Sequence, residues 1–182
     1  MAAVLGLEIE PVEQACQQAR AAGSGVWIAN DNCPGQIVIS GHEAGLDHVS
    51  PLLQDAGARK VVRLAVSIAA HSPLMEAAQE RFNLALAEAR IEAPRVGIIG
   101  NVHASELNHP DDIRADLAAQ LTSRVRWTES VERMLAAGLD TYIEMGPGNV
   151  LTGLLRRIDR SAVGYNLDEP ASFDHFSEAG AA

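Results

Sequence analysis

His71 is the residue of this chain whose type and setting are best suited to acid–base chemistry. It lies in the stretch Val66–Met75, directly after an expected strand and directly before an expected helix. A side chain at such a junction can project into a cleft, and an imidazole, which titrates near neutral pH, can take up a proton and return it. Spacing alone, however, favours the alternative of a structural histidine that caps the next helix.

A nucleophile to work with this histidine is missing from the 182 residues. The pattern Gly-x-Ser-x-Gly, in which a serine is exposed on a sharp turn, does not occur. The segment Gly41–Gly45 has its outline, but Glu43 stands at the serine position, so we expect this segment to begin a helix. Ser72 is next to His71, and adjacent residues of an extended chain project in opposite directions, so we expect Ser72 to cap a helix.

Composition excludes several other classes of function. The formal net charge of −10 argues against nucleic-acid binding, which needs a basic face. No apolar run is long enough to span a bilayer, and the first residues lack the pattern of a signal peptide. The two cysteines, Cys16 and Cys33, suit a reducing cytoplasm, with Cys16 expected to be a buried thiol. His103, His109 and the neighbouring aspartates lack metal-ligand spacing, so no metal or other cofactor is expected.

The elements of the first 65 residues alternate in the order β-α-β-β-α-β. Apolar spacing predicts helices over residues 10–22 and 43–54, with Val12, Ala15, Cys16 and Ala19 forming the stripe of the first. The predicted strands are residues 2–7, 26–30, 36–41 and 60–64. This order is that of the ferredoxin-like split motif, so residues 1–65 are predicted to form a small α+β subdomain.

The remainder, residues 66–168, predicts an α/β arrangement that is too narrow to be complete. A long helix is expected from Ser72 or Pro73 to Glu88, with Met75, Ala78, Phe82 and Leu86 at helical spacing. Further predicted elements are helices over 110–121, 127–137 and from the Gly146-Pro147-Gly148 turn to 158, and buried strands over 95–100 and 141–145. Two or three strands make an incomplete parallel sheet. Residues 169–182 are expected to form a polar tail.

Three segments together resemble the malonyl-CoA:acyl-carrier-protein transacylase (acyltransferase) family. They are Asn30–Gln36, Val66–Met75 around His71, and Glu144–Leu151 with its Gly-Pro-Gly turn, in family order and at about family spacing. The resemblance runs from Met1 to about Pro170. In that family the ferredoxin-like subdomain is inserted into an α/β-hydrolase-like domain, and the serine belongs roughly a hundred residues upstream of the material present. The sequence therefore resembles the C-terminal portion of such an enzyme, without its nucleophile region.

The resemblance also implies roles for individual residues. His71 matches the catalytic general base and acid, and Gln120 matches a glutamine whose backbone carbonyl orients that histidine. Asn30, Asn32 and Gln36 match the edge of the substrate cleft, although Asn and Gly are also ordinary turn formers. Asn101 is placed near the site by the same resemblance. The arginine that clamps the malonyl carboxylate has no counterpart in this sequence.

The implied function is malonyl transfer from coenzyme A to acyl carrier protein in fatty-acid or polyketide synthesis, through a serine acyl-enzyme. The expected partners are acyl carrier protein and a coenzyme A thioester, with neither nucleic acid nor membrane. Without the serine this chain alone is expected to be inactive. Two alternatives stay open: one subunit of a split acyltransferase, whose other chain supplies the missing N-terminal half, and a non-catalytic module that binds acyl carrier protein.

Overall fold

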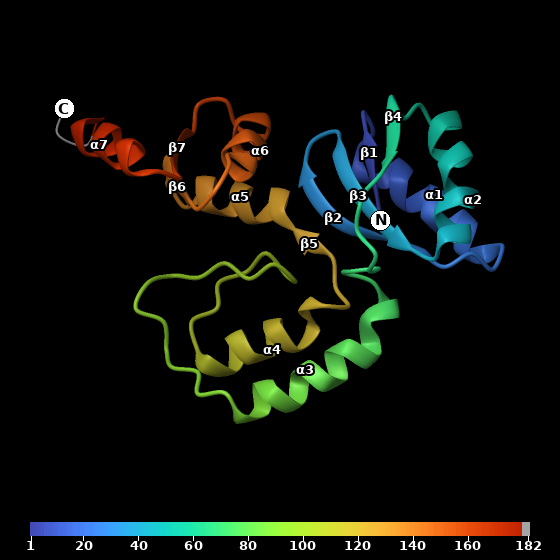
Figure 1. The fold of residues 1–182 in the computed structure, drawn as a ribbon, viewed down its shortest axis with the longest axis horizontal. Coiled ribbons are helices and arrows are strands. Elements are labelled where there is room, and N and C mark those ends of the chain that lie inside the picture. The colour runs from blue at the N-terminus through green and yellow to red at the C-terminus, as the bar shows by residue number, and fades with distance from the viewer. Residues whose placement is uncertain (180–182) are drawn as a thin grey trace. The chain divides into compact units, whose positions relative to one another are not determined.

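The computed structural model describes residues 1–179 and divides into two compact units, Met1–Ser130 and Val131–Ala182 (Figure 1). The predicted boundary between residues 65 and 66 lies inside the first unit and stays a prediction. Within residues 1–179 no helix is both long enough and apolar enough to cross a bilayer. Both units contain helices and strands, as the predicted α/β class requires.

The first unit is built on a five-stranded sheet with the order β4-β1-β3-β2-β5. Its strands are β1 (Ala2–Leu5), β2 (Val26–Cys33), β3 (Gln36–Gly41), β4 (Lys60–Arg63) and β5 (Val125–Arg126). The pairs β4–β1, β1–β3 and β3–β2 are antiparallel, whereas β5 joins the edge of β2 in parallel. The four predicted strands are therefore confirmed, while β5, only two residues long, carries no pattern that sequence could reveal.

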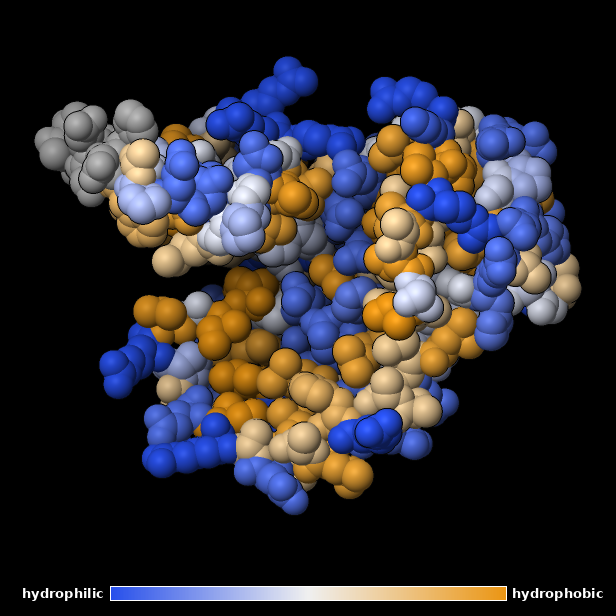
Figure 2. All heavy atoms as spheres, viewed as in Figure 1, coloured by the Kyte–Doolittle hydropathy of each residue, from blue (hydrophilic) through white to orange (hydrophobic). Residues whose placement is uncertain are grey.

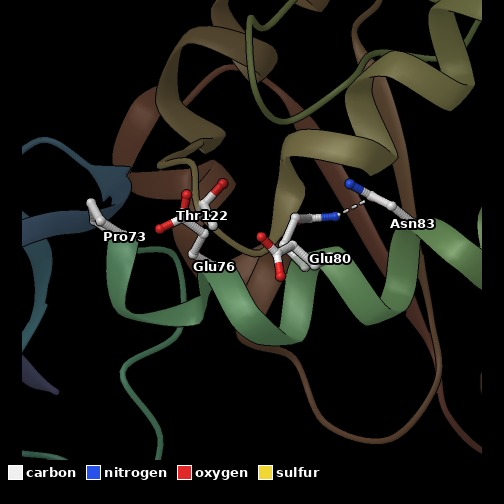
Figure 3. Close-up of a pocket in the computed structure, with 6 residues that line it drawn as sticks. Pro73, Glu76, Glu80, Asn83 and Thr122 are labelled. Carbon is white, nitrogen blue, oxygen red and sulfur yellow. Dashed lines mark hydrogen bonds between the residues drawn. The ribbon is translucent and has the colours of Figure 1, made fainter.

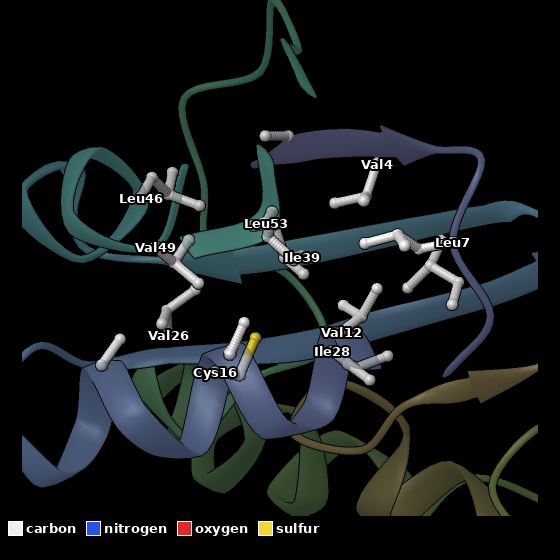
Figure 4. Close-up of a cluster of buried hydrophobic side chains, with 14 residues drawn as sticks. Val4, Leu7, Val12, Cys16, Val26, Ile28, Ile39, Leu46, Val49 and Leu53 are labelled. Atoms are coloured by element: carbon white, nitrogen blue, oxygen red, sulfur yellow. The ribbon is translucent and has the colours of Figure 1, made fainter. Parts of the chain in front are cut away.

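Two helices cover one face of this sheet and close its core. The helix α1 (Ile9–Ala21) buries Val12, Ala15, Cys16 and Ala19, which is the predicted stripe, and α2 (Glu43–Asp55) buries Leu46, Val49 and Leu53. Their side chains meet those of Val4, Ile37 and Ile39 from the strands (Figure 4). Burial raises the pKa of the Cys16 thiol to about 12, so this cysteine is a protonated core residue, as predicted.

The helices α3 (Glu76–Glu88) and α4 (Pro110–Gln120) pack against each other, and the short 3-10 helix η1 (Pro73–Met75) leads into α3. The predicted apolar stripe of α3 is wrong in part: Leu86 is buried, but Ala78 is exposed and Phe82 is 39% exposed. The residue buried instead is Gln79, at 5% exposure. A polar side chain faces α4 because it makes hydrogen bonds there, which apolar spacing does not register.

The strand predicted over residues 95–100 is absent. Only one isolated bridge forms, between Ile99 and Glu106, and the chain turns back on itself with Leu107 N–H donating to the Ile98 carbonyl at 2.9 Å. Within the described residues the segment has no second strand to pair with, so its apolar residues stay at the surface. Val96 is 76% exposed and Ile98 is 38% exposed. Figure 2 shows apolar side chains gathered over the part of the molecule that holds α3, α4 and the loop between them.

The second unit centres on a two-stranded parallel sheet. It holds most of α5 (Trp127–Ala136), followed by β6 (Thr141–Met145), α6 (Val150–Ile158), β7 (Val163–Leu167) and α7 (Pro170–Ala179). The strand β6 was predicted as buried, yet Ile143 is 44% exposed and Met145 is 76% exposed. The strand β7 was not predicted. The helix α7 occupies most of the expected polar tail, whose residues 180–182 lie outside the described part.

The Gly146-Pro147-Gly148 segment makes the predicted turn from β6 into α6. Gly146 and Gly148 have φ of 131° and 86°, values that favour glycine over residues with a side chain. The carboxylate of Glu144 on β6 accepts hydrogen bonds from the N–H groups of Leu151 and Thr152, at 2.9 and 2.7 Å. Burial alone would raise the pKa of Glu144, but these hydrogen bonds outweigh it and lower that pKa from its ordinary value. A strand carboxylate thus caps the first turn of α6.

Candidate active site

The backbone holds His71 in an unusual conformation between β4 and η1. Its φ of 58° lies in the left-handed region, which costs free energy for a residue with a side chain and persists only where the surroundings enforce it. The enforcing contact is a hydrogen bond of 3.0 Å from His71 N–H to the carbonyl of Leu121, the C-cap residue directly after α4. The imidazole is thereby set against the C-terminal end of that helix, and the side chain is partly buried.

The ring of His71 is oriented by the residue before Leu121. Its Nδ1 lies 3.0 Å from the backbone carbonyl oxygen of Gln120. A carbonyl can only accept a hydrogen bond, so the Nδ1 that faces it must carry the proton. The side-chain amide nitrogen of Gln120 also approaches Nδ1, but at 3.4 Å it is too long to compete. In the neutral ring Nε2 is then left with its lone pair, which is the state a general base requires.

The side chain of Gln120 continues the group to Asn101. The amide of Asn101 donates from Nδ2 to Oε1 of Gln120 at 3.2 Å. The loop that carries Asn101 is held by Asp116 of α4, a buried carboxylate that accepts the N–H of Val102 at 3.1 Å. A Cβ at Gly100 would overlap this carboxylate, so the loop can approach α4 only with glycine there. His71, Gln120 and Asn101, which lie far apart in sequence, therefore form one hydrogen-bonded group.

Asn30, on the hairpin of β2 and β3, is linked to this group through backbone pairing. Asn30 pairs with Val38 of β3 on one side and with Val125 of β5 on the other, and the next pair along is Asp31 with Arg126. The N–H of Arg126 in turn donates to the Asn101 carbonyl at 3.1 Å. Asn32 and Gln36 lie further along, where β2 turns into β3. Their contact with a substrate stays a prediction.

The predicted start of α2 is correct, whereas the predicted helix cap at Ser72 makes no cap hydrogen bond. The segment Gly41–Gly45 leads into α2 at Glu43, which confirms that it is no nucleophile turn. Ser72 stands at the N-cap position of η1, but its hydroxyl donates backward to the Ala69 carbonyl at 2.7 Å and makes no cap bond. This contact braces the loop just before His71. His109 caps α4 in a capping box with Asp112.

Sequence patterns missed two features of the site. The carbonyl of Leu121 accepts a hydrogen bond from the His71 backbone. Every residue type carries a backbone carbonyl, so the identity of residue 121 gives no sign of this contact. Gln79 contacts the same helix end from α3, and the apolar stripe predicted for that helix did not include it. The available signal was its position about one turn after Met75 and one turn before Phe82, two residues of that stripe.

Comparison with known proteins places this geometry in a family. A family model described as "Acyl transferase domain" matches residues 1–169. The chain is 38% identical over 174 residues to the malonyl CoA-acyl carrier protein transacylase of Bacillus subtilis (strain 168), and 38% identical over 172 residues to that of Escherichia coli (strain K12). These alignments cover 96% and 94% of this chain but only 55% of each relative, so the chain spans about half the length of the curated relatives it matches.

Solved structures agree with the sequence relatives. An acyl carrier protein S-malonyltransferase from Vibrio cholerae superposes with a TM-score of 0.93 at 40% identity, over 96% of this chain and 57% of that one. A malonyl-transacylase in complex with a type II polyketide synthase acyl-carrier protein superposes with a TM-score of 0.94 at 32% identity, over 98% of this chain and 57% of that one. With a family model that matches nearly its whole length, the chain belongs to the acyl transferase domain family.

Proposed function

We propose that this chain provides the general base and one wall of the substrate cleft for malonyl transfer from coenzyme A to acyl carrier protein. The observation that carries the proposal is the 3.0 Å contact between His71 Nδ1 and the Gln120 carbonyl, which leaves Nε2 ready to accept a proton. The names of the relatives, which are malonyl CoA-acyl carrier protein transacylases, supply the substrates. A serine outside these 182 residues would serve as nucleophile.

The proposed reaction has two half-reactions, and in each of them His71 takes up one proton and gives it to the leaving group. Nε2 of His71 takes the proton of the serine hydroxyl as its oxygen attacks the malonyl thioester carbon, and the coenzyme A thiolate that leaves receives that proton. The carrier thiol then gives its proton to Nε2, attacks the serine ester, and the serine oxygen is protonated as it leaves. His71 ends each cycle as it began, so no further acid or base is required.

The rest of the assignment rests on topology and on the relatives. The strand order β4-β1-β3-β2, with α1 and α2 on one face, supports a ferredoxin-like fold for residues 1–65, and residues 66–168 correspond to the return of the chain into an α/β-hydrolase-like domain. Acyl carrier protein is the proposed partner, because a structural neighbour is a transacylase in complex with such a carrier. The proposed compartment is the cytoplasm, where both cysteines would stay reduced.

The first test uses the chain alone and then completes it. Incubated with malonyl-CoA, the 182-residue chain should acquire no covalent malonyl group, as measured by intact-protein mass spectrometry, because a base without a nucleophile forms no acyl-enzyme. Fusion of the N-terminal part of the Bacillus subtilis relative ahead of Met1 should restore transfer to acyl carrier protein. A stoichiometric adduct on the chain alone would overturn the assignment of the nucleophile to another segment.

In the completed enzyme, His71→Ala should lower turnover by roughly two to four orders of magnitude, as expected for lost general acid–base catalysis. His42→Ala is the matched control, because His42 is exposed and makes no side-chain cap bond. His109→Ala is a poorer control, since His109 caps α4. Equal losses in the His42 and His71 variants would remove the basis for His71 as base. Carrier binding without transfer by the completed, otherwise native enzyme would favour the binding-module alternative.

A further inference from the structure

The carboxamide of Gln79 lies inside the last turn of α4. Its Oε1 accepts the N–H of Leu121 at 2.8 Å, and its Nε2 donates to the carbonyl of Leu117 at 3.2 Å. In a regular α-helix those two backbone groups, four residues apart, would bond directly to each other. An amide carries one donor side and one acceptor side, so it can bridge the pair when they are drawn apart. The side chain of Gln79 thus replaces the final hydrogen bond of the helix.

The turn that Gln79 bridges, at the C-terminal end of α4, is also the one that makes hydrogen bonds to His71. Leu121 donates its N–H to Gln79 while its carbonyl accepts the N–H of His71 at 3.0 Å. The carbonyl just before it, that of Gln120, accepts from Nδ1 of the same histidine. Two consecutive carbonyls can both serve His71 only if the peptide units at this helix end are fixed in one orientation. Gln79 supplies the contact that fixes the Leu121 unit from the opposite side.

Burial and a third hydrogen bond also fix the position of the Gln79 side chain. The residue is only 5% exposed, and the remaining proton on Nε2 goes to Oδ1 of Asn83, one turn along α3, at 2.8 Å. Figure 3 shows the place where this happens, a pocket on α3 with Asn83 at one end of the dashed hydrogen bond and Thr122 across from the helix. Every polar atom of the carboxamide is therefore occupied, which is how a buried amide holds a neighbour in register.

We propose that Gln79 is a positioning residue for His71, which it controls through the shape of the α4 C-terminus and without touching the ring. The effect of Gln79 on catalysis rests on the proposed function of His71, whereas its effect on the structure of His71 does not. Whether Gln79 sets the tautomer and conformation of His71 can be measured in the chain without any reaction. Removal of the carboxamide lets Leu121 N–H close back onto Leu117, which rotates the two carbonyls away from His71.

The test reads the imidazole of His71 in the full 182-residue chain by long-range ¹H–¹⁵N NMR under conditions in which the ring is neutral. The signals are assigned by their loss in His71→Ala. The native chain should show the Nδ1–H tautomer. Gln79→Met, which keeps the length of the side chain and removes both bonds, should give the mixture of tautomers of a free imidazole. Gln79→Glu, which keeps the acceptor for Leu121, should be intermediate. Glu80→Gln, exposed and in the same pocket, is the control and should match the native chain.

In the enzyme completed as above, Gln79→Met should lower kcat about tenfold with KM unchanged, since a small displacement of a catalytic group costs rate rather than affinity. A native tautomer in a folded Gln79→Met or Gln79→Glu chain would overturn the proposal. An altered tautomer with full activity would leave the positioning role intact and instead contradict His71 as the base. A variant that fails to fold is recognised by lost dispersion in the same spectrum, and Gln79→Glu then decides the matter.

Discussion

Residues 2–64 and residues 131–179 both consist of helices beside a sheet, but they differ in how far their apolar side chains are buried. Every member of the buried core cluster lies between Ala2 and Leu53, with Val12, Ile39 and Leu53 completely buried. In the second segment the sheet has two strands, and Ile143, Met145 and Val163 are at least 44% exposed. The difference shows that the first segment can close a core with its own two helices. The second presents apolar faces that its own elements do not cover.

Parallel strands are ordinarily buried on both faces. The apolar residues of β6 and β7 are therefore typical of strands whose faces are covered by other parts of a protein. The relatives are nearly twice as long as the aligned part of this chain, and under the proposed function the additional length carries the serine. The same additional length is the proposed cover for β6. Four measurements test whether the two segments differ in packing, and their expected effects differ in size.

The largest effect is expected from a pair of identical substitutions. Ile39→Ala should lower the free energy of unfolding by about 2–5 kcal/mol, because it opens a cavity around a residue with no exposed surface. Ile143→Ala should change it by less than about 0.5 kcal/mol, since Ile143 is already 44% exposed. Urea denaturation followed by far-UV circular dichroism measures both. Similar losses in the two variants would mean that β6 is as well packed as β3.

A second pair, Gly41→Ala and Gly153→Ala, should give opposite signs. A Cβ on Gly41 would overlap the Gly25 carbonyl and crowd Val26, and such overpacking costs about 1–3 kcal/mol. Gly153 lies within α6 with no atom near the new methyl group, so alanine should stabilise the helix by up to about 1 kcal/mol. Thermal melting of both variants is the measurement, and a stabilised Gly41→Ala would show that β3 and its neighbours can relax.

Hydrogen exchange should be slower in residues 2–64 than in residues 95–158 of the isolated chain. Exchange from a closed core needs wider opening than exchange from elements with uncovered faces, and we expect about a tenfold difference in rate, or about 1.4 kcal/mol in opening free energy. Mass spectrometry of deuterium uptake resolves the two ranges. Uniformly strong protection in a monomer would show that the second range is self-sufficient, and the claim of missing cover would then be withdrawn.

The smallest effect concerns the cap of α6. Since the pKa of Glu144 is lowered in the folded chain, its contribution to stability is complete above the ordinary value of 4.5 and is lost as the pH falls through the folded value. Glu144→Gln should therefore lower stability by less than about 1 kcal/mol at pH 7, with the difference from the native chain closing below about pH 4. Melting curves from pH 7 to pH 3 test this. A difference that persists at pH 3 would point to packing and not to charge.

Elements whose apolar residues pack within the same short stretch were predictable from the sequence. The stripe of Val12, Ala15, Cys16 and Ala19, the start of α2 at Glu43 and the turn at Gly146–Gly148 all appear where the pattern places them. In each case the signal is local, because the residues that bury a helix face or permit a turn lie within a few positions of one another.

Three errors of the prediction concern strands whose pairing depends on a distant partner. The residues around Val96 have the apolar composition of a strand, but within residues 1–179 they form no more than the isolated bridge of Ile99 with Glu106. The strand β7 pairs with β6 despite an unremarkable pattern, and β5 is too short to carry a pattern. Pairing depends on what the rest of the chain brings alongside.

The candidate site divides in the same way. From the sequence alone, His71 could be placed at a junction suited to acid–base chemistry, and the resemblance to a family pointed to Gln120 and Asn101. Only the tertiary structure decided which ring nitrogen faces a carbonyl, and that Leu121 and Gln79 hold the helix end that presents it. The physical reason is that these contacts use backbone groups, which every residue carries. Their direction is set by how α3, α4 and the His71 loop pack, so no residue type records it.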